Sequence, residues 1–394
     1  MRINQVRMLN FRNHADSVID FSSPGLTVIT GPNGAGKTSV LEAVHVLATG
    51  RSFRTTRETA MIRESSATSL PRAFLDCWAE RSGRKIRIGM GLGEVSPKFL
   101  LNGAKRTHAR EITGLLRCVI FSPDDLDLIK GGPSLRRDYL DTILVAVVPR
   151  LSALVQEWER VLKQRNALLR TAPAGARRVN LSALATWTDL LVEKGALLTA
   201  ERMNLCEKLR PFFVEAVDAL SGQSADLHYN PSWAPLDVDP QADILRGFLV
   251  KALEREQRAE FDRRLTLVGP HRDALDVSLQ GRDARSCASQ GEQRTLALGL
   301  RLGNLGLLEQ ACDEDPILLL DDVFSELDTS RRARLLSFLP KTQTLVTMTD
   351  DPNIAAPSSE FFTAFADAGL CKENVNDFKK GWGTVRIEGG KVIL

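Results

Sequence analysis

The chain has 394 residues, of which 43% are hydrophobic and 26% are charged, and its formal net charge is only +3. A chain of this size can bury a large core and is expected to form two lobes. Its charge alone does not indicate a nucleic-acid-binding protein. No apolar run approaches the roughly twenty residues of a membrane-spanning helix, and the N-terminus lacks the apolar centre of a signal peptide. We therefore expect a cytoplasmic protein without a membrane partner.

The first motif of the chain is GPNGAGKT at residues 31–38. Residues 1–11 alternate like a strand, and the β-branched run at 26–30 predicts a buried strand directly before the motif. Residues 39–47 have the 3.6-residue spacing of a helix. The glycines therefore lie in a strand-to-helix turn, which is where phosphate-binding loops occur.

The chemistry of this turn favours a nucleoside triphosphate. Glycines let the backbone N–H groups point inward around phosphates, where the positive end of the helix dipole adds to them. The lysine would reach the β- and γ-phosphates and the threonine hydroxyl would ligate Mg²⁺. The alternative is a glycine-rich turn with an incidental lysine. The expected nucleotide-binding residues are Gly31, Pro32, Asn33, Gly34, Ala35, Gly36, Lys37 and Thr38.

Residues 51–110 are strongly basic for so balanced a chain. They hold thirteen Lys and Arg against five Asp and Glu, a local net charge of +8. Such an excess suits sequence-independent contacts with phosphates, although a solvated basic strand face is the alternative. Few aromatic residues accompany these charges, which favours duplex backbone binding over base stacking.

Residues 151–260 read as a helical insertion. One apolar stripe runs from Leu151 to Leu169 through Trp158, and a second runs from Leu184 to Leu209. Turn-forming residues at 171–178 separate the two helices, and those at 231–240 precede a third helix near 241–260. We interpret the Leu and Trp positions as helix packing within a short arm, not as a cofactor site.

Residues 289–294, SQGEQR, precede and begin a long apolar helix. Ser289 lies at the expected N-cap, where its hydroxyl and the Gly291 backbone could face a γ-phosphate, with Gln290 and Glu292 alongside. The alternative is an ordinary capping box, because Glu292 follows Ser289 by three positions.

The apolar run at 317–320 predicts a central parallel strand that ends at Asp321. A carboxylate at that strand end, beside a phosphate loop, is placed to hold Mg²⁺, and Asp322 is the candidate to orient or deprotonate the attacking water. The alternative is the acidic start of a solvated loop. Further strands are expected at 344–350 and within VRIEGGKVIL at the end of the chain.

Taken together, GPNGAGKT, the S-x-G-E-Q segment and LLLDD-x-x-SELD resemble the Walker A, signature and Walker B plus D-loop motifs of ABC-type ATPase heads of the Rad50 and SMC group. The segments at 10–14 (NFRNH), 49–55 (TGRSFRT), 121–141 and 267–275 (LVGPHRDAL) narrow this resemblance to the bacterial RecF family. The 250 residues between Thr38 and Ser289 are also too few for the long coiled coils of Rad50 or SMC proteins.

The resemblance implies an α/β fold: an ABC-type ATPase head, that is, a P-loop NTPase with a mixed sheet and flanking helices, carrying an inserted short helical arm. We expect the head at 1–122 and 263–394 and the arm at 123–262. The chain departs from the ABC-type ATPase pattern at two positions. No glutamine occupies the Q-loop position near 122–124, and no histidine occupies the switch position, so Thr349 or Asp350 must serve there.

The resemblance also implies an ATP- and Mg²⁺-dependent homodimer with weak, DNA-stimulated ATPase activity in DNA repair, replication and the SOS response. Lys37 and Asp322 would act in one subunit and Ser289 in trans, with Thr38 and Asp321 at the metal. Double-stranded and gapped DNA would be bound, and RecR and RecO would be partners in placing RecA. The resemblance favours DNA contact by the basic residues of 51–110 over a solvated strand face. The candidates are Arg51, Arg54, Arg57, Lys105, Arg106 and Arg110.

Two other classes of protein are considered. One is an SMC-like structural clamp that binds ATP with negligible turnover. The other is the ATPase subunit of a transporter, for which an LSGGQ-like signature, a Q-loop, a switch histidine and a shorter helical insert would be expected.

Overall fold

The protein was analysed as a computed structural model that describes residues 1–21, 25–63, 72–93, 98–171, 181–312, 314–323, 334–335, 342–349 and 383–393. The chain forms two compact units. Unit 1 comprises residues 1–125 and 305–394, and unit 2 comprises residues 126–304. The division of the chain at 122 and 262 into head and arm stays a prediction.

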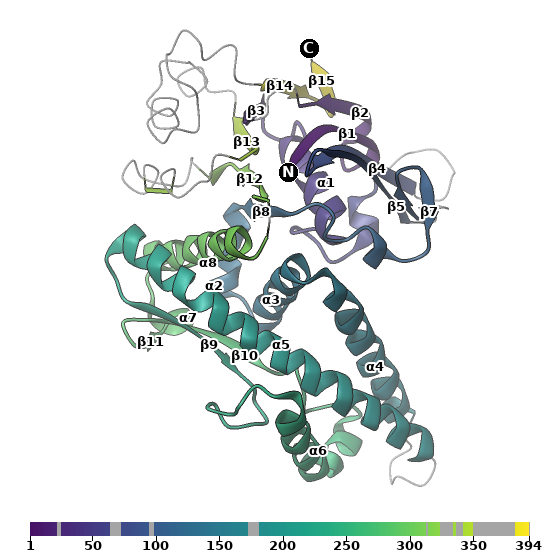
Figure 1. Ribbon diagram of the computed structural model, residues 1–394, viewed down its shortest axis with the longest axis vertical. Coiled ribbons are helices and arrows are strands. Elements are labelled where there is room, and N and C mark those ends of the chain that lie inside the picture. Colours follow the sequence, from purple (N-terminus) through teal and green to yellow (C-terminus); the bar gives the residue numbers. More distant parts are fainter. Residues whose placement is uncertain are drawn as a thin grey trace. The chain divides into compact units, whose positions relative to one another are not determined.

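The first sheet of unit 1 is antiparallel and begins at the N-terminus (Figure 1). Two of its hairpins turn through two-residue loops, Ser82–Gly83 and Asn102–Gly103, in which both residues have positive φ. Such loops match the twist of the flanking strands. In sheet order its strands are β2 (His14–Asp20), β1 (Arg2–Phe11), β4 (Arg72–Arg81), β5 (Arg84–Gly93), β6 (Phe99–Leu101) and β7 (Ala104–Arg106).

The second sheet of unit 1 carries the predicted parallel strands. Its strands are, in order, β15 (Lys391–Ile393), β14 (Gly383–Glu388), β3 (Leu26–Gly31), β13 (Thr344–Thr349), β12 (Ile317–Asp321) and β8 (Cys118–Phe121). All pairs are parallel except β14 with β15. Every residue of β12 is buried, as expected for a central parallel strand. The strand-like end of the sequence is the β14–β15 hairpin, which extends this sheet beside β3.

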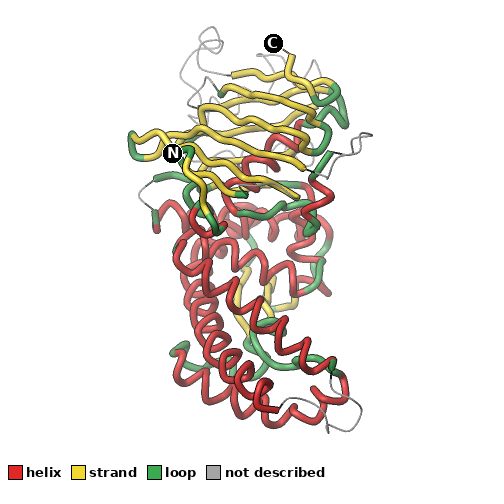
Figure 2. The backbone as a smooth tube through the Cα atoms, turned by 90° about the vertical axis from the view of Figure 1, so that its right-hand side faces the viewer, coloured by secondary structure: helices red, strands yellow, loops and turns green. Residues whose placement is uncertain are grey.

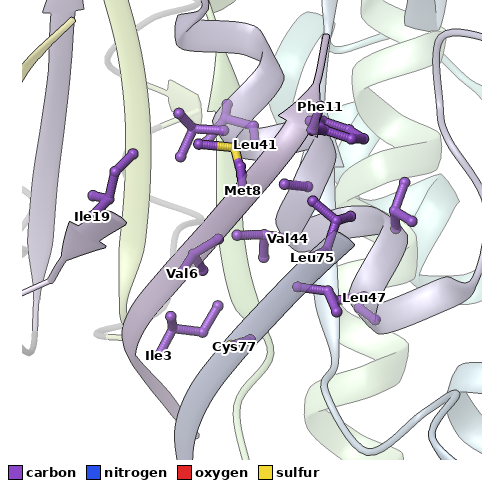
Figure 3. Packing of buried hydrophobic residues seen from close by; sticks show 14 of the residues in the cluster. Ile3, Val6, Met8, Phe11, Ile19, Leu41, Val44, Leu47, Leu75 and Cys77 are labelled. Atoms are coloured by element: carbon purple, nitrogen blue, oxygen red, sulfur yellow. The ribbon is translucent and has the colours of Figure 1, made fainter. Parts of the chain in front are cut away.

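Helix α1 (Lys37–Thr49) is buried along nearly its whole length between the two sheets. Its Leu41, Val44 and Leu47 face strands β1 and β4 in Figure 3. Each such side chain, fully removed from water, contributes about 1.5–3 kcal/mol. The packing therefore fixes α1, and with it the turn that precedes α1. Three 3-10 turns lie in the connections: η1 (Glu58–Met61) between α1 and β4, η2 (Ala109–Glu111) between β7 and β8, and η3 (Pro123–Leu126) after β8.

Unit 2 is mostly helical (Figure 2). The first apolar stripe lies on α4 and the second on α5, where Leu184, Leu191 and Leu209 are buried. At 41 residues, α5 is about 60 Å long. The separator at 172–178 lies outside the described residues. The helices are α2 (Asp127–Lys130), α3 (Pro133–Val147), η4 (Pro149–Leu151), α4 (Ser152–Arg170), α5 (Leu181–Ser221), α6 (Ala242–Arg263), α7 (Ala284–Cys287) and α8 (Gln290–Ala311), which continues into unit 1.

Unit 2 also contains a small antiparallel sheet that the helical pattern did not predict. Its strands are β11 (Arg282–Asp283), β10 (Ala274–Leu279) and β9 (Ala225–Asn230). The residues of β9 alternate between buried and half-buried, a period of two that does mark a strand. The insertion between 151 and 260, expected to be helical, therefore also contains the strand β9, which lies between the second and third expected helices.

The segment 267–275 anchors this sheet to the helices of unit 2. Asp273 is fully buried and accepts a hydrogen bond from the Tyr229 hydroxyl at 2.8 Å. The Arg202 guanidinium donates to Asp141 at 2.8 and 2.7 Å and to the Pro270 carbonyl at 2.9 Å. Burial raises the pKa of Asp273 to about 6. Removing one partner of such a buried pair typically costs about 3–5 kcal/mol, so this segment acts in folding.

No helix in the described part of the chain has the length and apolar character to cross a membrane. Five of the six cysteines lie within the described ranges, and none of these five forms a disulfide with another. Cys371 lies outside them.

Candidate nucleotide-binding site

The phosphate-loop motif occupies the predicted strand-to-helix turn. Strand β3 ends at Gly31 and α1 begins at Lys37. Gly31 has φ +150°, and a Cβ atom there would lie 2.1 Å from the Ile387 carbonyl oxygen of β14. Only glycine therefore fits at the first position of the loop. The Lys37 ammonium donates to the carbonyls of Gly31 at 2.6 Å and Pro32 at 3.0 Å, so this side chain lies over the loop.

A second motif meets the loop at the end of β12. The Thr38 hydroxyl donates to Asp321 Oδ1 at 2.8 Å, although the two residues are 283 positions apart. Burial raises the pKa of the Asp321 carboxyl, while hydrogen bonds from Thr347 and Thr38 act in the opposite direction. A hydroxyl and a buried carboxylate offer the hard oxygen ligands that Mg²⁺ prefers. The side chains at this point therefore fit a magnesium ion.

Thr347 on β13 is a site residue that sequence reasoning missed. It pairs in register with Asp321, and its hydroxyl donates to Asp321 Oδ1 at 2.7 Å. The same hydroxyl accepts the backbone N–H of Asp322 at 3.1 Å, and Asp322 has φ +49°. One buried threonine thus contacts both acidic residues. It is one of three threonines in TLVTMT. Threonine is common in strands, so the sequence pattern does not single out Thr347.

Glu42 links three segments beside the loop. It lies on α1, is fully buried, and accepts from Arg12 Nε at 2.8 Å and from the Ser52 hydroxyl. Arg54 Nη1 lies 3.6 Å from Glu42 Oε2, and the positive charge of Arg54 offsets part of the rise that burial gives the pKa of Asp321. Arg54, a predicted DNA contact, therefore belongs to the electrostatic environment of the loop.

The other predicted DNA contacts fall into two groups. Arg51 and Arg57 are exposed in the segment after α1. Lys105 is exposed on β7, where Arg106 Nε lies 3.8 Å from Glu111 Oε2. The side chain of Arg110 lies outside the described part of the structure.

Ser289 precedes α8 and takes part in a capping box. Its backbone N–H donates to Glu292 Oε2 at 2.8 Å, and the Glu292 N–H donates to the Ser289 hydroxyl at 3.4 Å. Gln223 Nε2 adds a bond to Glu292 at 3.1 Å. Ser289 and Gln290 are exposed and Gly291 is half-buried. The first turn of α8 therefore keeps an exposed face besides its internal bonds.

The remaining expected elements are only partly described. After β8, the Ser122 N–H donates to Asp125 Oδ2 at 2.9 Å, closing a turn at the Q-loop position. Thr349 ends β13. Asp350 and the SELD segment at 325–328 lie outside the described residues.

A phosphate loop between a parallel strand and a buried helix, facing a carboxylate at the end of β12, two strands along the same sheet, defines a P-loop NTPase site. Comparison with known families agrees: residues 2–366 match the RecF/RecN/SMC N-terminal domain. SMC heads share the fold, one with a TM-score of 0.50 at 17% identity. The fold is thus that of an ABC-type ATPase head.

Curated relatives narrow the class further. The chain is 39% identical to the DNA replication and repair protein RecF of Acidothermus cellulolyticus, over 90% of this chain and 95% of that protein. It is 37% identical to the Streptomyces avermitilis RecF, with the same coverage. A solved structure described as "the recombination mediator protein RecF-ATPrS in RecFOR pathway" matches 99% of this chain and 97% of its own, with a TM-score of 0.83 at 28% identity. The chain belongs to the RecF family of DNA replication and repair proteins.

Proposed function

We propose that this protein is an ATP-dependent DNA-binding protein that dimerises on ATP and uses slow hydrolysis as a switch. The observation that carries the proposal is the bond between Thr38 and Asp321, which joins the phosphate loop to a strand-end carboxylate. A similar solved structure is described as RecF with ATP, at 28% identity and a TM-score of 0.82. This supports ATP as the nucleotide.

The roles follow from the geometry. Residues 31–38 would hold the phosphates, with the Lys37 ammonium moving from the loop carbonyls to phosphate oxygens. Thr38 and Asp321 would hold Mg²⁺, which would neutralise charge on the phosphates. Asp322 would orient or deprotonate water. Its side chain is shorter than the glutamate usual in this position, which would make turnover slow.

The dimer would complete the site in trans. Ser289 of the partner subunit, with its Gln290, Gly291 and Glu292, would present a hydroxyl, N–H groups and a helix N-terminus to the γ-phosphate. Because both surfaces contact one ligand, ATP would favour the dimer and hydrolysis would release it.

ATP turnover measured with and without duplex DNA distinguishes the proposed ATPase switch from an SMC-like structural clamp. We expect wild-type turnover to be slow and raised by DNA. Asp322→Asn keeps the size of the side chain but removes its basicity, so we expect turnover to fall at least about tenfold. Equal turnover of both proteins, close to background, would favour the clamp. ATP turnover that requires added membranes would instead favour the ATPase subunit of a transporter.

Thr347→Val removes the hydroxyl that orients Asp321 while keeping the shape of the side chain. Hydrogen bonds to charged groups contribute about 1.5–3 kcal/mol, so we expect turnover to fall about tenfold or more. ATP affinity measured without Mg²⁺ should change less than about twofold, since the phosphate loop is untouched. Thr347→Ser should retain activity. Thr344→Val, at a buried position on the same strand, is the control; an unchanged Thr347→Val enzyme would contradict this role.

DNA contact is proposed for basic residues of unit 1, among them the exposed Lys105 and the half-buried Arg106. Reversing both charges to Glu should weaken duplex binding about equally for all sequences and lower the slope of log affinity against log salt by about 2. Fluorescence anisotropy across a salt series measures both. Reversing Arg160 and Lys163, exposed on α4, is the matched control. An equal loss in both double variants would contradict a site on the β6–β7 hairpin.

The partners are proposed from the family alone. Relatives named DNA replication and repair protein RecF, and a solved structure placed in the RecFOR pathway, support RecR and RecO as partners and gapped DNA as the substrate, with RecA placed on the exposed strand.

A further inference from the structure

The outer side of the phosphate loop is held by two segments from opposite ends of the sequence. Asn13 Nδ2 donates to the carbonyls of Gly34 at 3.1 Å and Ala35 at 2.8 Å. His14 Nε2 lies 3.1 Å from the Gly36 carbonyl. The Gly390 N–H, in the turn between β14 and β15, donates to the same Ala35 carbonyl at 3.0 Å. Three successive carbonyls of the loop are therefore bonded from one side.

Because each peptide unit is planar and trans, a bond to its carbonyl also sets the direction of its N–H group. In each peptide unit the C=O and the following N–H point in opposite directions. The Ala35 N–H, which follows the Gly34 carbonyl, donates to the Pro32 carbonyl at 3.1 Å. Fixing the carbonyls of Ala35 and Gly36 toward Asn13, Gly390 and His14 thus turns the N–H groups of Gly36 and Lys37 to the opposite side of the loop. Those N–H groups are the ones with which a phosphate loop binds its ligand.

The two clamping segments also hold each other. The Ser17 hydroxyl donates to the Gly390 carbonyl at 2.9 Å and lies 3.0 Å from His14 Nδ1. A Cβ atom on Gly390 would lie 2.2 Å from the Asn13 carbonyl oxygen, whereas one on Gly389 would meet nothing within 4 Å. Both glycines have positive φ, +56° at 389 and +75° at 390. The close approach is therefore specific to Gly390.

We propose that Asn13, His14 and the β14–β15 turn at Gly390 are positioning residues that preorganise the phosphate loop for nucleotide. The proposal rests on the nucleotide site proposed above and gives the C-terminal hairpin a part in it. A hairpin that only completes the sheet would contribute to folding and leave the affinity of the folded protein unchanged.

The test compares Gly390→Ala with Gly389→Ala in the full chain. Both substitutions carry the strain of a positive φ, but only the first displaces the turn from Asn13. We expect Gly390→Ala to raise the dissociation constants of ATP and ADP by about five- to tenfold, which corresponds to the loss of one to two net hydrogen bonds. Gly389→Ala should change both dissociation constants less than about twofold. KM should rise while kcat at saturating ATP stays within about twofold, because the residues of hydrolysis are untouched.

A second set of variants tests the side chains that bond to the loop carbonyls. Asn13 is half-buried, so its truncation is compatible with folding. Asn13→Ala should raise both dissociation constants by about fivefold with little change in melting temperature measured without nucleotide. At the buried His14, Gln keeps a donor near the Gly36 carbonyl and should retain more affinity than Leu. If Gly390→Ala does not fold, Asn13→Ala and the two His14 variants decide the question.

The outcomes separate this inference from the proposed function. Equal effects of the two glycine variants on nucleotide affinity would contradict the positioning role of Asn13, His14 and Gly390. Lowered melting temperatures with unchanged affinities would contradict it as well. If wild type binds no ATP and is indistinguishable from Lys37→Met, the proposed function itself fails.

Discussion

Lys37→Met should abolish ATP binding while leaving the protein folded. Methionine keeps the length of the side chain but removes the ammonium, which donates to loop carbonyls; Lys37 as a residue is 9% exposed. Removing one partner of a buried charged contact costs about 2–5 kcal/mol, so we expect ATP affinity to fall at least about thirtyfold. Titration with a fluorescent ATP analogue measures this, and circular dichroism checks the fold.

Lys85→Met provides the matched control, since Lys85 is exposed on β5 of the same unit. It should bind ATP like wild type. An ATP affinity of Lys37→Met within about threefold of wild type would show that the glycine-rich turn is only structural.

Ser289→Arg should leave ATP binding intact and prevent ATP-dependent dimerisation. A bulky cation at the exposed N-terminus of α8 would block the approach of the signature turn to a neighbouring subunit's phosphates. We expect the dimer dissociation constant, measured by sedimentation with ATP and duplex DNA, to rise at least about a hundredfold. Ser286→Arg, at an exposed serine three residues earlier, is the control for added bulk and charge.

Ser289→Asp separates the trans role from the capping box. Aspartate is as good an N-cap as serine, so the start of α8 should keep its stability. Its negative charge would nevertheless repel a γ-phosphate, and dimerisation should fail. A Ser289→Asp protein that dimerises like wild type would leave capping as the whole role of this residue.

Mixing the two defective proteins gives the sharpest result. In a hybrid of a Lys37→Met subunit and a Ser289→Arg subunit, one composite site has both its lysine and the partner's serine intact. Turnover absent from each variant alone should therefore reappear in the mixture. Its absence, with hybrids detected by sedimentation, would exclude the shared site.

Local sequence patterns were sufficient for the elements next to the motifs. The strand, turn and helix around Gly31 and Lys37, the buried strand at 317–320 and the amphipathic helices α4 and α5 follow from spacing alone. Each of these elements makes its pattern from residues that are neighbours in sequence. The family-level resemblance, confirmed by the comparisons, supplied the ABC-type fold.

Pairings between distant segments left no comparable signal. No periodicity could show that Thr347 pairs in register with Asp321, or that Gly390 bonds to Ala35. The strand β9 was missed because it follows a 41-residue helix and pairs with β10 more than forty residues later. The roles assigned to Ser289, Asp322 and the basic residues stay predictions, because each depends on a ligand or a second chain.

The strand that feeds the phosphate loop has both of its neighbours near the end of the chain. Among the strands that the structure describes, β3 pairs with β13 and β14, which follow it by more than three hundred residues. During translation, the GPNGAGKT segment leaves the ribosome long before either neighbour exists. A nascent chain therefore cannot assemble an ATP-competent pocket until its final strands emerge, and this late closure of long-range pairs predicts slow maturation.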